Sequence, residues 1–181
     1  MAYMKIKTAL IDFVETVIVS GVVILTIYSF VGSVESISGP SMEPTFYTNQ
    51  RILVDKIFRK FDRGNIVVLY PPGMERKHFI KRIVGMPGDI FKIYNCNLYV
   101  AKDNLRFILQ ENYLAESSCT YGNMGVREGR AMRIPEGYYL VMGDNRGNSV
   151  DSRVFGLVDE KLILGRVVFR FWPLTKFGFV L

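Results

Sequence analysis

The chain has 181 residues, 49% hydrophobic and 22% charged, which allows one domain with a membrane segment and excludes intrinsic disorder, collagen and coiled coils. Its net charge of +6 leaves nucleic acid and anionic lipid open as partners. Two cysteines and one histidine exclude a disulfide-rich miniprotein and a zinc site built from four Cys or His ligands.

An uncharged apolar segment, TVIVSGVVILTIYSFVGSV, occupies residues 16–34. As a helix it would span about 28 Å at roughly 1.5 Å per residue, close to the ~30 Å hydrocarbon core of a bilayer. A buried core helix or strand pair is the alternative, but no turn signal interrupts the run. We therefore predict a transmembrane helix over residues 13–34.

The flanking charges predict how this helix is oriented. Lys5 and Lys7 precede it, and the next basic residue is Arg51. The positive-inside rule then places a short tail, residues 1–12, in the cytoplasm and residues 35–181 outside the cell membrane. A cleavable signal peptide is the competing interpretation, but its apolar region normally has about 7–15 residues and rarely follows acidic residues. We predict a retained, single-pass anchor.

Beyond this segment, short stretches rich in β-branched and aromatic residues alternate with Gly, Pro, Asn and Asp. The stretches are RILVDKIF, NIVVLYPP, HFIKRIVG, DIFKIYN, LYVAKD, GYYLVMGD and LILGRVVFRFWP. Runs of about 6–12 residues separated by turn residues are typical of strands, and helical periodicity is weak here. The sequence predicts one mainly antiparallel β domain.

Three segments differ from ordinary strand and turn sequence. The first, SGPSMEPTF at residues 38–46, surrounds Ser41 with two prolines and a glycine that restrict the backbone. A serine in a rigid turn can present its hydroxyl and a fixed backbone N–H together, as acyl transfer requires. Taken alone, the segment is equally consistent with a plain Pro-rich turn.

The second segment is FIKRIVGMPGD at residues 79–89. On a strand, Lys81 would share a face with Phe79 and Ile83, so its amine would be desolvated and its pKa lowered. A lysine that is neutral near pH 7 can act as a general base. His78 has the opposite parity, and we interpret it as a surface residue. The alternative for Lys81 is a solvent-facing lysine.

The third segment is GDNRGNSVDSR at residues 143–153, rich in acids, amides, serines and arginines. A solvated loop is the usual interpretation of such a run. The flanking stretches GYYLVM and VFGLV are apolar, so the segment should cross between buried strands. Its polar groups would then need to pair with one another to offset their desolvation.

In this order after one membrane segment, SMEPT, KRIVGMPGD and GDNRGNSVDSR resemble the motifs of the bacterial type I signal peptidases, most closely the short Gram-positive form. The resemblance covers nearly the whole chain and is weakest over residues 95–128. It implies the antiparallel β-sheet catalytic domain of the signal peptidase and SOS-repressor proteases, preceded by one transmembrane helix. The implied activity is a serine endopeptidase, a hydrolase that removes signal peptides at Ala-x-Ala-like sites.

The resemblance also implies a role for individual residues. Ser41 would be the nucleophile and its backbone N–H an oxyanion donor, Lys81 the general base, and Ser149 the residue that hydrogen-bonds and orients the lysine. Two ion pairs would support the site, namely Arg82 with Asp144 and Asp151 with Arg153. Residues matching the shallow apolar substrate pockets, each equally compatible with ordinary β core, are Ile37, Met42, Phe46, Phe79 and Ile80.

One position departs from part of the family. Some members take a second oxyanion donor from a hydroxyl two residues before the nucleophile, where this chain has Gly39. A neighbouring hydroxyl or a water would have to replace it. The sequence also leaves open whether Cys96 and Cys119 form a disulfide or stay free, and whether Trp172 is a core residue or an interfacial anchor.

The implied partners are secretory preproteins and the lipid bilayer, with no nucleic acid, no obligate protein partner and no cofactor, because Ser/Lys chemistry needs none. Of the charged residues, 21 basic and 15 acidic ones lie beyond residue 34, and we expect this basic excess to face anionic headgroups. The alternative function is a catalytically silent relative that assembles secreted or pilus-type proteins, which should lack the Ser or the Lys. A self-cleaving SOS-type repressor would need a DNA-binding region and no anchor.

Overall fold

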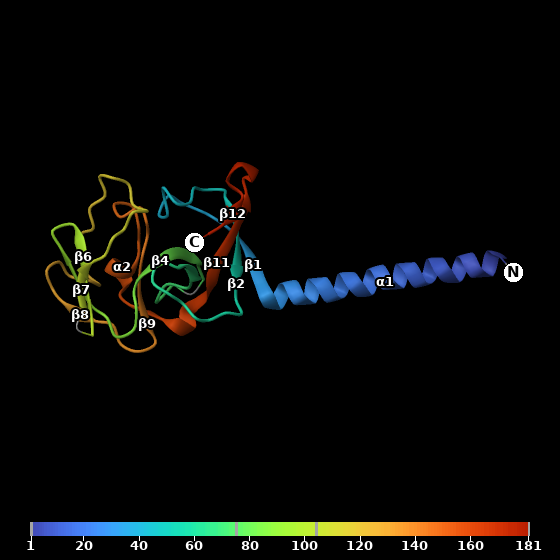
Figure 1. The fold of residues 1–181 in the computed structure, drawn as a ribbon, viewed down its shortest axis with the longest axis horizontal. Helices are drawn as coiled ribbons and strands as arrows, with labels where there is room; N and C mark the ends of the chain where they lie inside the picture. The colour runs from blue at the N-terminus through green and yellow to red at the C-terminus, as the bar shows by residue number, and fades with distance from the viewer. Residues whose placement is uncertain (1, 75, 104, 181) are drawn as a thin grey trace.

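The computed structural model describes residues 2–74, 76–103 and 105–180, with side chains described outside residues 2–8 and 27–31. Helix α1 (Ala2–Val31) extends away from the β domain (Figure 1). The prediction that the helix continues to residue 34 is wrong, because Gly32–Ser36 form a strand that pairs with Arg51–Asp55. Its stretch Ala9–Thr26 has a mean hydropathy of 2.1, and none of this stretch is buried. Within the described ranges, α1 alone is long and apolar enough to cross a membrane. A core helix would be mostly buried, so α1 fits a membrane anchor.

The larger of two antiparallel sheets, here called the main sheet, follows α1 directly. Within the described residues its strand order is β1-β2-β11-β3-β4-β9-β10, and β12 pairs with β11. The strands are β1 (Gly32–Ser36), β2 (Arg51–Asp55), β3 (Ile66–Leu69), β4 (Phe79–Gly85), β9 (Tyr138–Met142), β10 (Val158–Asp159), β11 (Ile163–Trp172) and β12 (Gly178–Phe179).

The second sheet, here called the small sheet, has the order β7-β6-β5-β8. Its strands are β5 (Ile90–Tyr94), β6 (Asn97–Lys102), β7 (Leu105–Ile108) and β8 (Met132–Arg133). Three short helices complete the described elements, α2 (Ser152–Phe155), η1 (Glu160–Leu162) and η2 (Leu174–Lys176). The mainly antiparallel β fold predicted from the sequence is confirmed.

Strand β3 shows how the core is built around the middle of the main sheet. Ile66 and Val68 pack into one apolar cluster, whereas Val67 and Leu69 pack into another. Successive side chains of a strand point to opposite faces, so this strand is covered on both sides. Its neighbour β4, which carries Lys81, pairs with it in antiparallel register, with Val67 opposite Lys81.

Two alternatives that the sequence leaves open have an answer in the fold. Cys96, in the turn after β5, forms a disulfide with Cys119. Trp172, at the end of β11, is 50% exposed and therefore does not belong to the core.

Candidate active site

Ser41 and Lys81 meet beside β4, an inner strand of the main sheet. Ser41 lies in the turn after β1, and Lys81 lies on β4 with its Nζ 2.9 Å from Ser41 Oγ. Lys81 Nζ also donates a 2.8 Å hydrogen bond to the Ile80 carbonyl. An amine and a hydroxyl at this separation can exchange a proton directly.

Lys81 is almost completely enclosed, with 3% of its surface exposed and its Nζ 5.1 Å from the centre of the Phe79 ring. Burial lowers the pKa of Lys81 from 10.5 to about 8; the charges of Asp151 and Asp144 oppose this fall, and Arg153 adds to it. The amine is therefore neutral in an appreciable fraction of molecules near neutral pH. His78, immediately before β4, is exposed and lies on the rim of the same site, with Nδ1 3.4 Å from a Glu35 carboxylate oxygen.

The third segment holds the Ser41 turn in place. The backbone N–H of Asn145 donates a 3.0 Å hydrogen bond to the Ser41 carbonyl, and Asn145 Nδ2 donates at 3.2 Å to the Pro40 carbonyl. Gly143 lets the two segments approach, because a Cβ there would collide with the Ser41 carbonyl oxygen and with Ser149 Oγ. The position of the hydroxyl is thus set by contacts between segments about a hundred residues apart.

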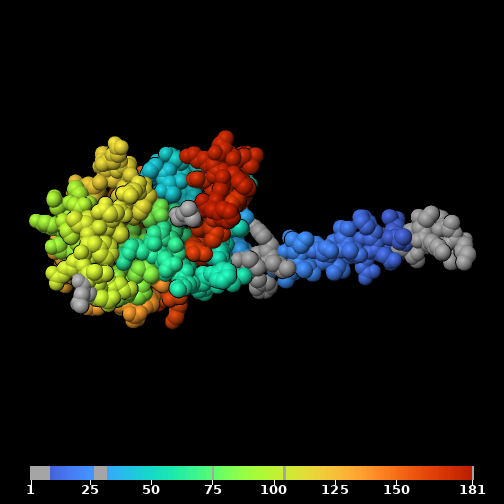
Figure 2. Space-filling view, in the orientation of Figure 1, coloured from blue at the N-terminus to red at the C-terminus, as the bar shows by residue number. Residues whose placement is uncertain are grey.

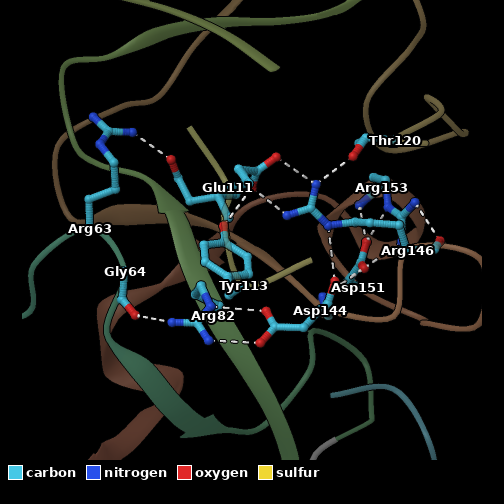
Figure 3. Close-up of polar contacts among 12 residues, drawn as sticks. Arg63, Gly64, Arg82, Glu111, Tyr113, Thr120, Asp144, Arg146, Asp151 and Arg153 are labelled. Carbon is cyan, nitrogen blue, oxygen red and sulfur yellow. Dashed lines mark hydrogen bonds and ion pairs between the residues drawn. The ribbon is translucent and has the colours of Figure 1, made fainter. Parts of the chain in front are cut away.

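Two buried ion pairs flank Lys81, and both were expected from the sequence (Figure 3). Arg82 donates to the Asp144 carboxylate at 2.9 and 2.7 Å, and Arg153 donates to Asp151 at 2.8 and 2.7 Å. Burial alone would raise the pKa of Asp151, but the hydrogen bonds and charge of Arg153 hold it below its ordinary value. The Asp151 carboxylate therefore stays ionised beside the lysine.

Ser149 is close to this centre, but its expected hydrogen bond to Lys81 is not formed. Lys81 Nζ donates instead to Ile80 and contacts Ser41. Ser149 Oγ is buried and makes no hydrogen bond of good geometry among the described residues, but it is close enough to the Asp151 carboxylate to help lower the pKa of Asp151. Its orienting role therefore stays a prediction. Within the same ranges, no three His, Cys, Asp or Glu side chains are placed to hold a metal ion.

A cleft of about 840 Å³ opens at Ser41 and Lys81. Four of the five expected pocket residues line it, namely Ile37, Met42, Phe79 and Ile80. Phe46 does not line it. Its side chain is fully buried in the core cluster that contains Ile52 and Val54, and a pocket role for it stays a prediction. Ser38 also lines the cleft. Its hydroxyl is a neighbouring group of the kind that could serve as the second oxyanion donor.

Sequence reasoning did not identify Arg146 as a site residue, nor four residues that contact Arg82 or Arg146. Their buried or half-buried side chains hydrogen-bond or stack around the second and third segments. They are Thr45, Glu111, Tyr113 and Thr120. Thr45 lies inside the SMEPT segment, but the other three lie where the resemblance is weakest, in a polar run that looks like an exposed loop.

Known proteins that are similar to this chain fall in one family. The family model described as signal peptidase, peptidase S26, matches residues 10–172. A probable signal peptidase I-2 from Synechocystis is 36% identical over 91% of this chain and 74% of its own length. Signal peptidase IB from Staphylococcus aureus is 33% identical over 96% of this chain and 95% of its own.

A solved structure is also similar. The crystal structure of a signal peptidase I from Enterococcus faecalis matches 59% of this chain and 96% of its own, at 26% identity and a TM-score of 0.47. Because the family model and the curated relatives cover most of the chain, the chain belongs to the signal peptidase family, peptidase S26. Within that family its relatives are bacterial type I signal peptidases, proteases that remove signal peptides.

Proposed function

We propose that this chain is a membrane-anchored serine endopeptidase that removes signal peptides with a Ser41/Lys81 dyad. The observation that carries the proposal is the 2.9 Å separation between Lys81 Nζ and Ser41 Oγ, in a site that lowers the pKa of the lysine to about 8. A silent assembly factor would have no need for a desolvated amine in contact with a serine hydroxyl. The dyad thus favours catalysis over that alternative.

In the proposed reaction, neutral Lys81 takes the proton of Ser41 Oγ, which attacks the scissile carbonyl carbon. The oxyanion is stabilised by the backbone N–H of Ser41 and by a second donor, for which the Ser38 hydroxyl is the nearest candidate in sequence. The Lys81 ammonium returns its proton to the leaving amine, and an acyl-enzyme remains. Lys81 then takes a proton from water, which attacks the ester, and Ser41 recovers its proton.

The cleft supports a preference for small side chains beside the scissile bond. Ile37, Met42, Phe79 and Ile80 are partly or fully buried and present large apolar walls. Such walls leave room for Ala, Gly or Ser and reject larger residues by steric exclusion. We therefore propose Ala-x-Ala-like sites as the substrate sequence.

The proposed location is the cell membrane, with a cytoplasmic tail over residues 1–12, an anchor from residue 13 to the end of α1 at Val31, and an external catalytic domain that begins with β1 at Gly32. Strand β1 follows α1 without a linker, and Ser41 lies only five positions beyond the end of β1 at Ser36. Anchoring both enzyme and precursor in one bilayer raises the effective concentration of the cleavage site. Secretory preproteins held by their signal peptides fit this arrangement.

Cleavage of a defined precursor by the full-length chain tests the dyad. With the enzyme reconstituted in lipid vesicles, mass spectrometry should find a cut directly after an Ala-x-Ala site. Ser41→Ala and Lys81→Ala should each lower kcat by about 10³-fold or more, as loss of a nucleophile or base does in other serine proteases. Ser117→Ala and Lys92→Ala, which change residues of the same type outside the cleft, serve as controls. Full activity in either dyad variant, or precursor binding without cleavage by the wild type, would refute the proposal.

A further inference from the structure

The segment that contains Glu111 and Tyr113 lies outside the three motifs but contacts two arginines inside them, Arg82 and Arg146. Glu111 accepts two hydrogen bonds from Arg146, at 2.9 Å from Nη1 and 2.5 Å from Nη2. The Arg146 side chain is 1% exposed and also donates to Thr120 Oγ1 and, at 3.0 Å, to the Gly143 carbonyl. A two-point pair with a buried guanidinium fixes both position and orientation. Glu111, Tyr113, Thr120 and Arg146 are called here the Arg146 cluster.

Tyr113 joins this cluster to the other ion pair. Its hydroxyl donates a 2.5 Å hydrogen bond to Glu111, and its ring lies 3.9 Å from Cζ of Arg82, within the range of a cation–π contact. Arg82 is the partner of Asp144. Figure 3 shows the Tyr113 ring against Arg82, with Glu111 between Tyr113 and Arg146.

Arg146 makes the connection to the second pair through its backbone. Its carbonyl accepts a 2.8 Å hydrogen bond from Nη1 of Arg153, which pairs with Asp151. The cluster therefore touches both ion pairs that flank Lys81. The cluster also balances charge. Glu111 pairs with Arg146, the third buried arginine, so that Asp151 remains the partner of Arg153. Without Glu111, a buried cation would remain without its carboxylate, a costly arrangement that would draw on the nearest acid.

We propose that Glu111 and Tyr113 are positioning residues, which hold the two ion pairs beside Lys81 in the geometry that a general base needs. The inference rests on the proposed Ser41/Lys81 dyad and adds two residues to its support. Neither residue touches the reacting atoms, so each acts through an arginine. Both residues lie in the connection between β7 and β8 of the small sheet, so this connection helps to support the active site.

The test compares Glu111→Gln, Tyr113→Phe and Tyr113→Leu in the full-length, vesicle-bound enzyme. Glu111→Gln should lower kcat about tenfold or more with little change in KM, because small misplacements of reacting groups are costly. It also leaves an uncompensated positive charge on Arg146, which opposes a second positive charge on Lys81. The acid limb of kcat/KM should therefore move to lower pH. Tyr113→Phe, which keeps the ring over Arg82, should retain more activity than Tyr113→Leu.

Acetylation of Lys81, followed by mass spectrometry across pH, reports the same titration without using cleavage. The pH midpoint of Lys81 acetylation should be lower in Glu111→Gln than in the wild type. If the wild type does not cleave, the proposed dyad is refuted, but the acetylation midpoint can still be measured. Glu116→Gln, an exposed acid on the same segment, and Tyr94→Leu, whose exposed ring contacts Lys92, are the matched controls. Unchanged kcat and Lys81 midpoint, or activity that only follows the folded fraction, would overturn the positioning role. If Glu111→Gln fails to fold, the two Tyr113 variants decide by the same criteria.

Discussion

At the scale of single residues, Lys81 shows how burial and charge act in opposite directions on one amine. Its strand neighbours and the Phe79 ring remove water, which favours the neutral form. The carboxylates of Asp144 and Asp151 favour the ammonium and offset part of that effect. The result is a pKa of about 8, between the ordinary value and the values of fully buried lysines.

The pH dependence of cleavage follows from this pKa. A base must be neutral to accept a proton, so activity is lost as pH falls through the pKa of Lys81. We expect kcat/KM to rise about tenfold per unit below pH 8 and to level off above it, as titration of a single base requires. Steady-state rates on a soluble precursor peptide between pH 6 and 10 measure this limb. A limb centred near pH 10, where an unperturbed lysine titrates, would contradict the assigned environment.

At the scale of elements, the disulfide ties the small sheet to the Arg146 cluster. Cys96 lies in the turn between β5 and β6, and Cys119 precedes Thr120, whose hydroxyl accepts a hydrogen bond from Arg146. The backbone N–H of Thr120 also donates to the Cys96 carbonyl at 3.3 Å. The disulfide thus restrains one end of the segment that carries Glu111 and Tyr113.

Removing the disulfide should therefore destabilise the fold. For a bridge that joins residues 23 positions apart, we expect Cys96→Ser with Cys119→Ser to lower the free energy of unfolding by about 2–4 kcal/mol. Urea unfolding with and without a reductant measures the change. The wild type should lose stability on reduction, whereas the double variant should not respond. Equal unfolding midpoints in all four samples would show that the bridge contributes nothing.

The sequence predicted the strands that are rich in β-forming residues. It did not predict strands that are defined only by pairing with a distant segment. Seven stretches with strong β-forming residues correspond to β2, β3, β4, β5, β6, β9 and β11. Strands β8, β10 and β12 have two residues each, so they exist only as pairing with a distant partner. Strand β7 is exposed along its whole length and carries no alternation of apolar and polar residues. Local pattern could not reveal these four, and it also missed β1, because residues 32–34 continue the apolar run of the helix.

At the scale of the whole molecule, the strands nearest α1 carry several exposed apolar side chains. Figure 1 shows β1, β2, β11 and β12 along the side from which α1 leaves, and Figure 2 shows the C-terminal segment on that side. The exposed apolar side chains of these strands and their flanks, here called the outer apolar residues, are Val34, Ile57, Phe58, Trp172, Leu174, Phe177 and Phe179. Exposed apolar groups next to a membrane helix suit the lipid interface.

Trp172 makes this placement measurable, because it is the chain's single tryptophan. With the full-length protein in vesicles, lipids brominated in their acyl chains should quench Trp172 fluorescence strongly, and aqueous iodide should quench it weakly. The basic excess of the domain predicts stronger lipid quenching in anionic than in neutral vesicles. Strong quenching by iodide together with no quenching by brominated lipid would place Trp172 in water. Equal quenching in both kinds of vesicle would remove the role of charge.

The sequence by itself determined the apolar helix, the main strands and the three segments that contain Ser41, Lys81 and both ion pairs, because these depend on local periodicity and on motif order. It also predicted the desolvation of Lys81 from the parity of its strand neighbours. Only the tertiary structure decided that Phe46 belongs to the core, that Cys96 pairs with Cys119, and that Glu111 and Tyr113 reach the site's arginines. These outcomes depend on which distant segments pack together, and no local pattern in one chain records that.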